Sequence, residues 1–243
     1  MKTPILETYV DRAKSNKISV IIAALNEEEN LELTYKKIVE AIKGRFSEYE
    51  IIIFDDGSID RTGKIADGIA LRDKWVSVVH HKKPMNLGYV YRSGIMMASK
   101  EYVILVTGDN DVPQEALEDT FDLRGQADIV IPYHINPEIR PLTRRILSKG
   151  FVCLMNNLFS LKLRYYNGMV LHKTAVVNSI SITTNSFAYQ AEVLVKLLKK
   201  GHSYIEVGIE LADRKKGKSK ALKISNVVNV VKSILVLRKE IGQ

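Results

Sequence analysis

The chain has 243 residues, of which 46% are hydrophobic and 26% are charged. Hydrophobic content this high excludes an intrinsically disordered protein, and the length suffices for one large domain or two small ones with a buried core. The 36 Lys and Arg against 28 Asp and Glu give a formal net charge of +8, which suits anionic partners such as nucleotides, nucleic acid or acidic lipid, or serves only solubility.

The single cysteine, Cys153, excludes a disulfide framework and a cysteine-based zinc site, and it indicates a reducing compartment. The N-terminal residues lack the uninterrupted apolar stretch of a secretory signal, and no window approaches the ~20 apolar residues of a membrane span. We therefore expect a cytoplasmic protein, with a peripheral contact to the inner face of the membrane left open.

In chain order, short β-rich runs alternate with amphipathic stretches through the first half of the sequence. Strands are expected at residues 18–24, 50–55, 76–80, 102–107 and, as a fifth candidate, 128–131. Helices are expected at residues 26–43, from about residue 60, and at about 88–98. This alternation predicts an α/β fold with a mostly parallel sheet flanked by helices.

From Pro132 onward the rhythm changes, because three prolines, at 132, 137 and 141, and a basic segment interrupt the chain. We expect a loop there, followed by an amphipathic helix at 150–159, a helix at 187–200, a strand at 204–211, a basic loop at 213–220 and an apolar tail at 224–237. The absence of repeats and of a Gly/Ser linker favours a single domain. Its expected parts are an N-terminal extension (1–17), the main domain (18–220) and a C-terminal amphipathic helix (221–243) that packs on the domain or lies at a membrane surface.

Three of the expected strands end in acidic or amide residues. These are Asn26 and Glu27, then Asp55 and Asp56 with Gly57 and Ser58, and finally Asp109, Asn110 and Asp111. Right-handed crossovers bring the C-terminal ends of parallel strands to one edge of the sheet, where ligands of open α/β sheets bind. One such cluster is typical of a turn with a helix cap, whereas three on one edge indicate a ligand site.

Asp109 and Asp111 form the strongest candidate metal site. Alternate residues of an extended segment project to the same side, and two carboxylates there repel each other unless a cation joins them. Mg²⁺ or Mn²⁺ takes such oxygen ligands together with substrate phosphates. The basic segment from Arg214 to Lys220 would grip the phosphates, although alone it is typical of a solvated loop. It lacks the first glycine of a P-loop, which excludes an ATPase of that class.

Six motifs occur in one order along the chain. They are Ala24-Leu-Asn-Glu-Glu-Glu-Asn-Leu31, Asp55-Asp-Gly-Ser-Ile-Asp-Arg-Thr62, Asn86-Leu-Gly88, Asp109-Asn-Asp111, Ala127-Asp-Ile-Val130 and Arg214-x-x-Gly-Lys-Ser-Lys220. Through them the chain resembles glycosyltransferase family 2 of the GT-A fold, a Rossmann-like α/β domain. Its size and its last motif are similar to those of dolichyl-phosphate mannose synthases and bacterial polyprenyl-phosphate sugar transferases.

The resemblance implies roles for individual residues. The donor nucleotide would contact Ala23, Leu25, Glu27, Asp55, Asp56 and Asn110, and its diphosphate end would contact Arg214 and Lys220. Asp109 and Asp111 would hold the Mg²⁺ or Mn²⁺ ion, and Asp111 would also act in catalysis. His134 stands where lipid-phosphate enzymes often carry an arginine.

The acceptor decides whether a general base is needed. For a hydroxyl acceptor, inverting transfer needs a base, and Glu192 is the candidate, against the alternative of a helix-surface carboxylate in an ion pair. A lipid phosphate is already ionised and needs no base. His134, Arg140, Arg144 and Arg145 would then orient it, unless they form only a solvated basic patch.

The sequence therefore predicts a metal-dependent, inverting glycosyltransferase that moves a sugar from a nucleoside diphosphate sugar to a polyprenyl phosphate or another membrane-proximal acceptor. Three alternatives stay open: transfer to a saccharide hydroxyl in cell-surface polysaccharide synthesis, a catalytically silent relative that binds nucleotide sugar, and a nucleotidyltransferase. The acidic strand ends speak against a nucleic-acid-binding module. The sugar, the base and the oligomeric state are not predicted.

Overall fold

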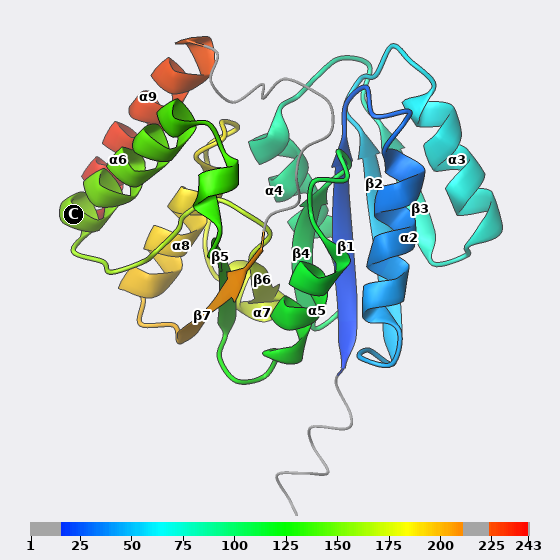
Figure 1. Ribbon diagram of the computed structural model, residues 1–243, viewed down its shortest axis with the longest axis horizontal. Coiled ribbons are helices and arrows are strands. Elements are labelled where there is room, and N and C mark those ends of the chain that lie inside the picture. Colours follow the sequence, from blue (N-terminus) through cyan, green and yellow to red (C-terminus); the bar gives the residue numbers. More distant parts are fainter. Residues whose placement is uncertain (1–15, 211–223, 243) are drawn as a thin grey trace, which may run out of the picture.

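The computed structural model describes residues 16–210 and 224–242. At its centre lies a seven-stranded sheet with the strand order β3-β2-β1-β4-β6-β5-β7 (Figure 1). The strands are β1 (Lys17–Ala24), β2 (Glu48–Asp55), β3 (Val76–His80), β4 (Tyr102–Thr107), β5 (Ile129–His134), β6 (Leu171–Lys173) and β7 (Tyr204–Ile209). The short β6 pairs antiparallel with β4 and β5, and every other pair of neighbours is parallel.

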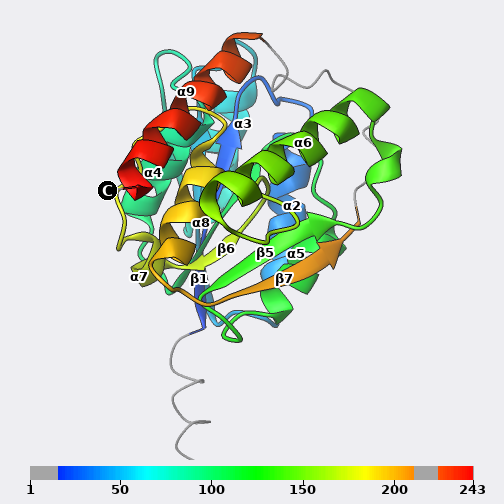
Figure 2. The same cartoon turned by 90° about the vertical axis from the view of Figure 1, so that its left-hand side faces the viewer.

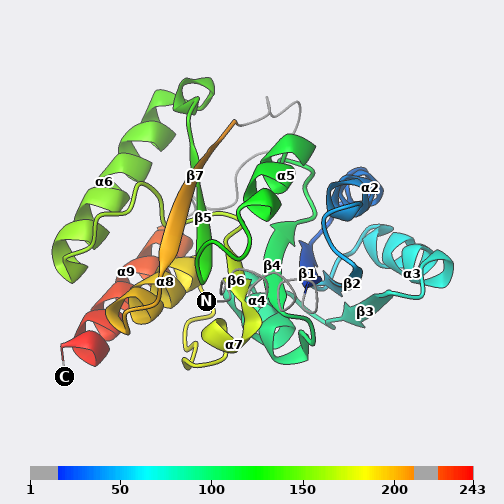
Figure 3. The ribbon, with the colours of Figure 1, turned by 90° about the horizontal axis from the view of Figure 1, so that it is seen from below.

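Helices cover both faces of this sheet (Figure 3). They are α2 (Leu31–Ile42), α3 (Thr62–Arg72), α4 (Leu87–Met97), α5 (Gln114–Asp122), the 3-10 helix η1 (Pro137–Ile139), α6 (Leu142–Phe159), α7 (Thr174–Val177), α8 (Tyr189–Lys199) and α9 (Ile224–Ile241). Side chains of α2, α3 and α5 join one core cluster, whereas those of α4, α6, α8 and α9 join another. Strand β1 contributes to both clusters, because Val20 and Ile22 point to the first cluster and Ile21 points to the second.

The predicted α/β fold with a mostly parallel sheet is confirmed. All four main strands form where the apolar runs predict them, and the fifth candidate becomes β5. The prediction misses β6, which has only three residues and is inserted antiparallel between β4 and β5.

Two predicted helix starts are wrong. The helix expected from Asn26 begins at Leu31, because Asn26 takes a left-handed backbone (φ 55°) and the N–H of Glu27 donates to Thr62 Oγ1 at 2.8 Å. The segment expected as a loop before residue 150 is largely helical, because α6 already starts at Leu142, directly after Pro141. Proline fits this position, since it has no N–H to leave unpaired at a helix start.

The C-terminal helix α9 lies beside α8 (Figure 2). Its Ile234 and Leu237 are 5% and 4% exposed and belong to the core. None of the helices that the structure describes is both long and apolar enough to cross a bilayer. The expected domain limits stay a prediction, since the extension falls mainly on residues outside the described ranges.

Candidate active site

The polar strand ends meet at one edge of the sheet. Ala24 pairs in register with Asp55, and Ala23 pairs with Thr107 on the other side. Two further bonds tie the turns that follow these strands to β1: the N–H of Asp56 donates to Ala24 O, and the N–H of Gly108 donates to Ala23 O, each at 2.8 Å. The three acidic clusters therefore lie on adjacent strands, as the parallel topology requires.

Asp55 is almost buried, at 7% exposure. One carboxylate oxygen accepts the N–H of Ser58 at 3.0 Å, and the other lies 3.0 Å from Nδ1 of His80. Hydrogen bonds to Asp55 and Asp67 raise the pKa of His80. Gly63 leaves room for this arrangement, since a Cβ at that position would come within 2.7 Å of the Asp55 carboxylate.

Asp56 is engaged within the protein. Its carboxylate accepts the N–H groups of Met85 at 2.8 Å and Asn86 at 3.1 Å, and it lies 2.7 Å from Nδ1 of His81. Asn86 has a left-handed backbone (φ 74°) and immediately precedes α4. Asp56 thus fixes the turn at the start of α4, and its predicted contact with the donor nucleotide stays a prediction.

The turn after β1 is joined to the turn after β2. The N–H of Asn26 donates to Ser58 Oγ at 3.0 Å, and its side-chain oxygen accepts the N–H of Ile59 at 2.9 Å. Glu27 is held through its N–H by Thr62 and through its carboxylate by the side-chain amide of Asn30 at 2.9 Å. These bonds bring Glu27 and Asp55 to a common wall of the edge. Ser58 belongs to a polar cluster that the sequence predicted, whereas Thr62 had been given no role.

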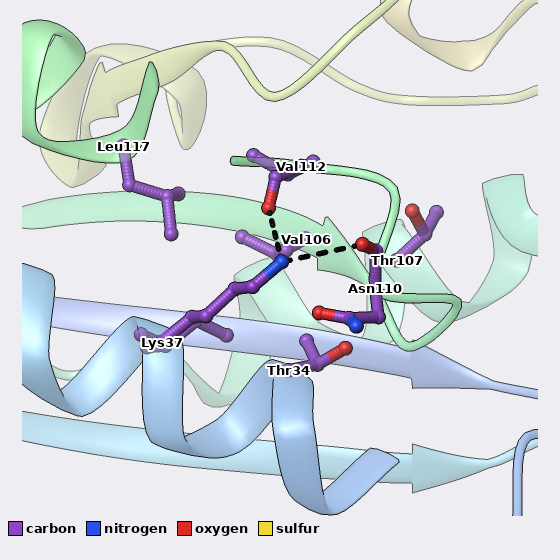
Figure 4. A pocket seen from close by; sticks show the side chains of 8 residues that line it. Thr34, Lys37, Val106, Thr107, Asn110, Val112 and Leu117 are labelled. Atoms are coloured by element: carbon purple, nitrogen blue, oxygen red, sulfur yellow. Dashed lines mark hydrogen bonds between the residues drawn. The ribbon is translucent and has the colours of Figure 1, made fainter. Parts of the chain in front are cut away.

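Asp109, Asn110 and Asp111 form a turn and not the expected extended segment. Strand β4 ends at Thr107, whose hydroxyl donates to Asp109 at 2.7 Å, and Asn110 is left-handed (φ 57°). Lys37 of α2 stabilises the turn from below, because its ammonium group donates to the carbonyls of Asn110 and Val112, each at 3.4 Å (Figure 4).

The donor set at this turn suits a hard divalent ion. Its carboxylates and amide supply oxygen ligands, and the side-chain oxygen of Asn110 is buried without a hydrogen-bond partner. Within the described ranges, no three His, Cys, Asp or Glu residues cluster closely enough to hold a metal by themselves. An ion bound by Asp109 and Asp111 would therefore take further ligands from water and substrate phosphates.

All four predicted acceptor residues line one cavity of about 350 Å³. Its wall combines the end of β5, η1, α6 and the segment after α6, and it consists of Tyr133, His134, Pro137, Arg140, Arg144, Arg145, Ser148, Lys149, Val152, Cys153, Arg164 and Tyr165. In the described part of the chain this wall carries no Asp or Glu, whereas it carries five permanent cations. The arrangement suits an anionic ligand.

Two polar atoms of this wall are buried without a hydrogen-bond partner: Nδ1 of His134 and Nε of Arg145. Burial, together with Arg140 and Arg144, lowers the pKa of His134 to about 3, so its ring is neutral at physiological pH. Buried donors in native proteins nearly always find a partner, and the N–H of Arg145 therefore indicates an acceptor atom supplied by a ligand or water. Arg140 is better satisfied, since it donates to the hydroxyl of Tyr165 at 3.3 Å.

Arg164 is a residue of this cavity that sequence reasoning missed. It donates to the Tyr133 hydroxyl, and its guanidinium lies 4.5 Å from the Tyr133 ring centre. Nothing in its local sequence distinguishes it from a solvated arginine. Only the pairing of β5 with β7 reveals it, because Glu206 of β7 accepts the backbone N–H of Arg164 at 2.7 Å.

Glu192 differs from these cationic groups, because it is a buried carboxylate that is paired within the chain. It is 4% exposed, and its carboxylate accepts the N–H groups of Thr183 and Thr184 at 2.8 and 2.9 Å and the ammonium group of Lys196 at 2.7 Å. Burial raises the pKa of Glu192, but the bonds from Lys196, Thr183 and Thr184 outweigh it and hold this pKa below its usual value. Arg214 and Lys220, predicted to hold the diphosphate, lie outside the described residues.

The architecture matches known structures of one enzyme class. A crystal structure of glucosyl-3-phosphoglycerate synthase from Mycobacterium tuberculosis, in complex with Mg²⁺ and UDP, superposes with a TM-score of 0.71 at 15% identity, over 98% of this chain and 85% of that chain. The fold is therefore the GT-A glycosyltransferase fold, as predicted.

Residues 19–187 match the family described as Glycosyl transferase family 2. The chain belongs to this family, which confirms the predicted resemblance. It is 28% identical, over 93% of its length, to a dolichol-phosphate mannosyltransferase of Pyrococcus furiosus, and it spans 65% of the length of that relative. It is 30% identical to a polyprenol monophosphomannose synthase of Mycolicibacterium smegmatis, over 83% of this chain and 79% of that protein.

Proposed function

We propose that this protein is a metal-dependent, inverting glycosyltransferase that moves a sugar from a nucleoside diphosphate sugar to a polyprenyl phosphate. The observation that carries the proposal is the cationic cavity with the unpartnered Nε of Arg145. The two relatives, a dolichol-phosphate mannosyltransferase and a polyprenol monophosphomannose synthase, support the same acceptor class.

The donor would bind at the edge formed by the ends of β1, β2 and β4. Asp55 and Glu27 are held there by backbone and side-chain bonds that leave little freedom. The Mycobacterium tuberculosis structure with Mn²⁺ and UDP-glucose supports a nucleotide sugar with a divalent ion in this fold. A divalent ion held by Asp109 and Asp111 would neutralise charge on the departing nucleoside diphosphate.

The acceptor cavity lies on the same side of the sheet. Because β6 is antiparallel to both β4 and β5, the latter two are parallel, and His134 therefore ends its strand at the edge that also carries Asp109. The three-residue β6 separates the first residues of these two strands by roughly 10 Å at the usual spacing between strands. An acceptor phosphate in the cavity would thus lie at the same edge of the sheet as a sugar attached at the donor site.

A phosphate acceptor also removes the need for a general base. It is a dianion or monoanion at neutral pH, and arginine presents paired N–H donors that match its oxygens. Arg140, Arg144 and Arg145 would orient one oxygen for in-line attack on the sugar. The buried carboxylate of Glu192 is consistent with this proposal, since it already accepts four hydrogen bonds within the chain.

An apolar surface next to the cavity supports a lipid-linked acceptor. On α6, Leu142, Ile146, Leu147 and Leu154 are 64%, 60%, 57% and 46% exposed. They alternate with Arg144, Arg145 and Lys149, so that the helix presents both lipid-compatible and cationic groups. Contact of this face with an anionic membrane would place the cavity at the level of lipid headgroups.

The experiment that tests the proposal measures transfer with radiolabelled UDP- and GDP-sugars, Mn²⁺ or Mg²⁺, and vesicles that contain either undecaprenyl phosphate or undecaprenol. We expect label in the lipid only with the phosphate form, with release of nucleoside diphosphate. Transfer to saccharides but never to lipid phosphate would contradict the acceptor. Formation of a nucleotide sugar and pyrophosphate from a nucleoside triphosphate and a sugar 1-phosphate would indicate a nucleotidyltransferase. Binding of a nucleotide sugar without any transfer would indicate a silent relative.

A further inference from the structure

The loop between α7 and α8 is held from two helices. Within it, the N–H groups of Thr183 and Thr184 both donate to Glu192 of α8, and the hydroxyl of Thr183 adds a third bond at 2.9 Å. On its other flank the hydroxyls of Thr184 and Ser186 lie 2.8 and 3.0 Å from Oγ of Ser233 in α9. The loop is therefore clamped between α8 and the C-terminal helix.

An ion triad of the buried Glu192 and Lys196 with the partly exposed Glu240 connects the same two helices. Lys196 of α8 is 5% exposed, and its ammonium group donates to Glu192 at 2.7 Å, to the carbonyl of Ser181 at 2.9 Å and to Glu240 in the last turn of α9 at 2.8 Å. Burial lowers the pKa of Lys196, but Glu192 and Glu240 outweigh it and raise this pKa. Because a buried ion without its partner is strongly unfavourable, the triad is complete only while α9 is seated.

The loop also contacts the donor edge. A Cβ on Gly88 would lie 2.7 Å from both the carbonyl oxygen of Thr184 and the carbonyl carbon of Asn185, so the loop packs directly on the first turn of α4. Two residues earlier, the N–H of Asn86 donates to Asp56. A continuous set of contacts thus runs from α9, through residues 183–186 and Gly88, to the turn that Asp56 holds.

We propose that Glu192, Lys196, Glu240 and Ser233 are positioning residues that couple the seating of α9 to the geometry of the donor edge. When α9 is seated, the loop presses on Gly88 and holds the turn of Asn86 and Asp56. When α9 is displaced, the loop loosens and the turn gains freedom, so the donor edge loses affinity for its nucleotide. The consequence for nucleotide binding rests on the proposed function, whereas the structural coupling does not.

Hydrogen exchange of the full chain tests the coupling without any ligand. Ser233→Ala and Glu240→Gln each remove one attachment of α9, and Lys239→Gln is the matched control, since it removes an exposed charge from the same helix. Ser233→Ala removes two hydroxyl contacts with the loop, and each variant should speed exchange by at least about fivefold in peptides covering 183–186 and also in those covering 85–90. Ser233→Thr keeps the hydroxyl and should restore the native rates.

Faster exchange at 183–186 with native exchange at 85–90 would overturn the proposal, as would native exchange at both. Gly88→Ala supplies a second check, because the added Cβ itself displaces the loop. In a double-mutant cycle, Ser233→Ala should then change exchange at 85–90 less in the Gly88→Ala background than in the native chain. Strict additivity would contradict a shared route through the loop.

Nucleotide binding then separates this inference from the proposed function. With Mn²⁺ and whichever of UDP or GDP binds the native chain, Ser233→Ala and Glu240→Gln should raise Kd by about fivefold and leave kcat at saturation unchanged, while Lys239→Gln matches the native chain. If neither nucleotide binds the native chain, the proposed function fails, and the exchange experiment alone decides the coupling.

Discussion

Replacement of Arg145 by methionine tests the acceptor cavity most directly. Its Nε is buried without a hydrogen-bond partner, so the native side chain contributes an unsatisfied donor to the folded protein. Leaving such a donor unpaired costs roughly 1–3 kcal/mol, and methionine retains much of the apolar stem. We therefore expect the melting temperature of Arg145→Met to equal that of the native protein or to exceed it by a few degrees, at about 2–4 °C per kcal/mol for a domain of this size.

Function should change in the opposite direction. A hydrogen bond from a guanidinium to a phosphate contributes about 1.5–3 kcal/mol, which corresponds to a loss of about 10- to 150-fold in kcat/KM for the lipid phosphate. Arg145→Lys keeps the charge but not the planar guanidinium, so its kcat/KM should lie between those of the native protein and Arg145→Met. The matched control is Arg72→Met, since Arg72 is an exposed partner of Glu32.

The assay compares thermal unfolding with transfer to undecaprenyl phosphate in vesicles. A native kcat/KM in Arg145→Met would refute the assignment of the cavity. A marked drop in melting temperature together with lost activity would show that the arginine holds the fold, and this too would refute the reasoning.

Three further predictions follow from the same geometry. Asp109→Asn should fold normally but lose at least about 100-fold in kcat and lose Mn²⁺-dependent stabilisation by nucleotide, as measured by thermal shift; near-native transfer would contradict the metal assignment. Glu192→Gln should raise KM for the donor and leave kcat within about threefold, whereas a general base would show a kcat loss of about 100-fold or more. Burial is the main cause that lowers the pKa values of His134 and His172 from 6.5 to about 3. Between pH 6.5 and pH 3 the unfolded chain therefore binds protons at these two histidines that the folded chain does not bind. Stability in urea should therefore fall as pH drops from 6.5 toward 3, and less so in His172→Gln; a pH-independent midpoint in the native chain would contradict this.

The sequence predicted the strands β1, β2 and β4 well, because parallel strands are buried on both faces and appear as apolar runs. The polar residues after such runs must then share an edge, which places Glu27, Asp55 and Asp109 together without further information. What the sequence could not supply is the backbone of the turns. The left-handed Asn26 and Asn110 shorten the expected helix and bend the expected extended segment.

For the proposed acceptor cavity, the sequence predicted four lining residues but not where the helices that shape the cavity begin. Prolines at 137 and 141 indicated a loop, yet each stands at the start of a helical segment. Arg164 had no local signal, since its position depends on contacts with Tyr133 and Glu206. The pair Glu192 and Lys196 has the i,i+4 spacing of a helix ion pair, but its third member Glu240 is 44 residues further along the chain than Lys196 and has no local signal.

The contrast between two cationic side chains, Lys196 and Arg145, explains how one chain combines stability with binding. Lys196 has its full set of partners within the chain, in Glu192, Glu240 and the carbonyl of Ser181, and so it fixes the packing of α8 and α9. Arg145 lies in a cavity wall without carboxylates among the described residues and keeps one buried donor unpaired. A cation that the chain satisfies holds the fold, whereas a cation that it leaves unsatisfied gains most from an external anion. On this reasoning, truncation of Lys196 should lower stability first and activity only as a consequence, while truncation of Arg145 should lower activity alone.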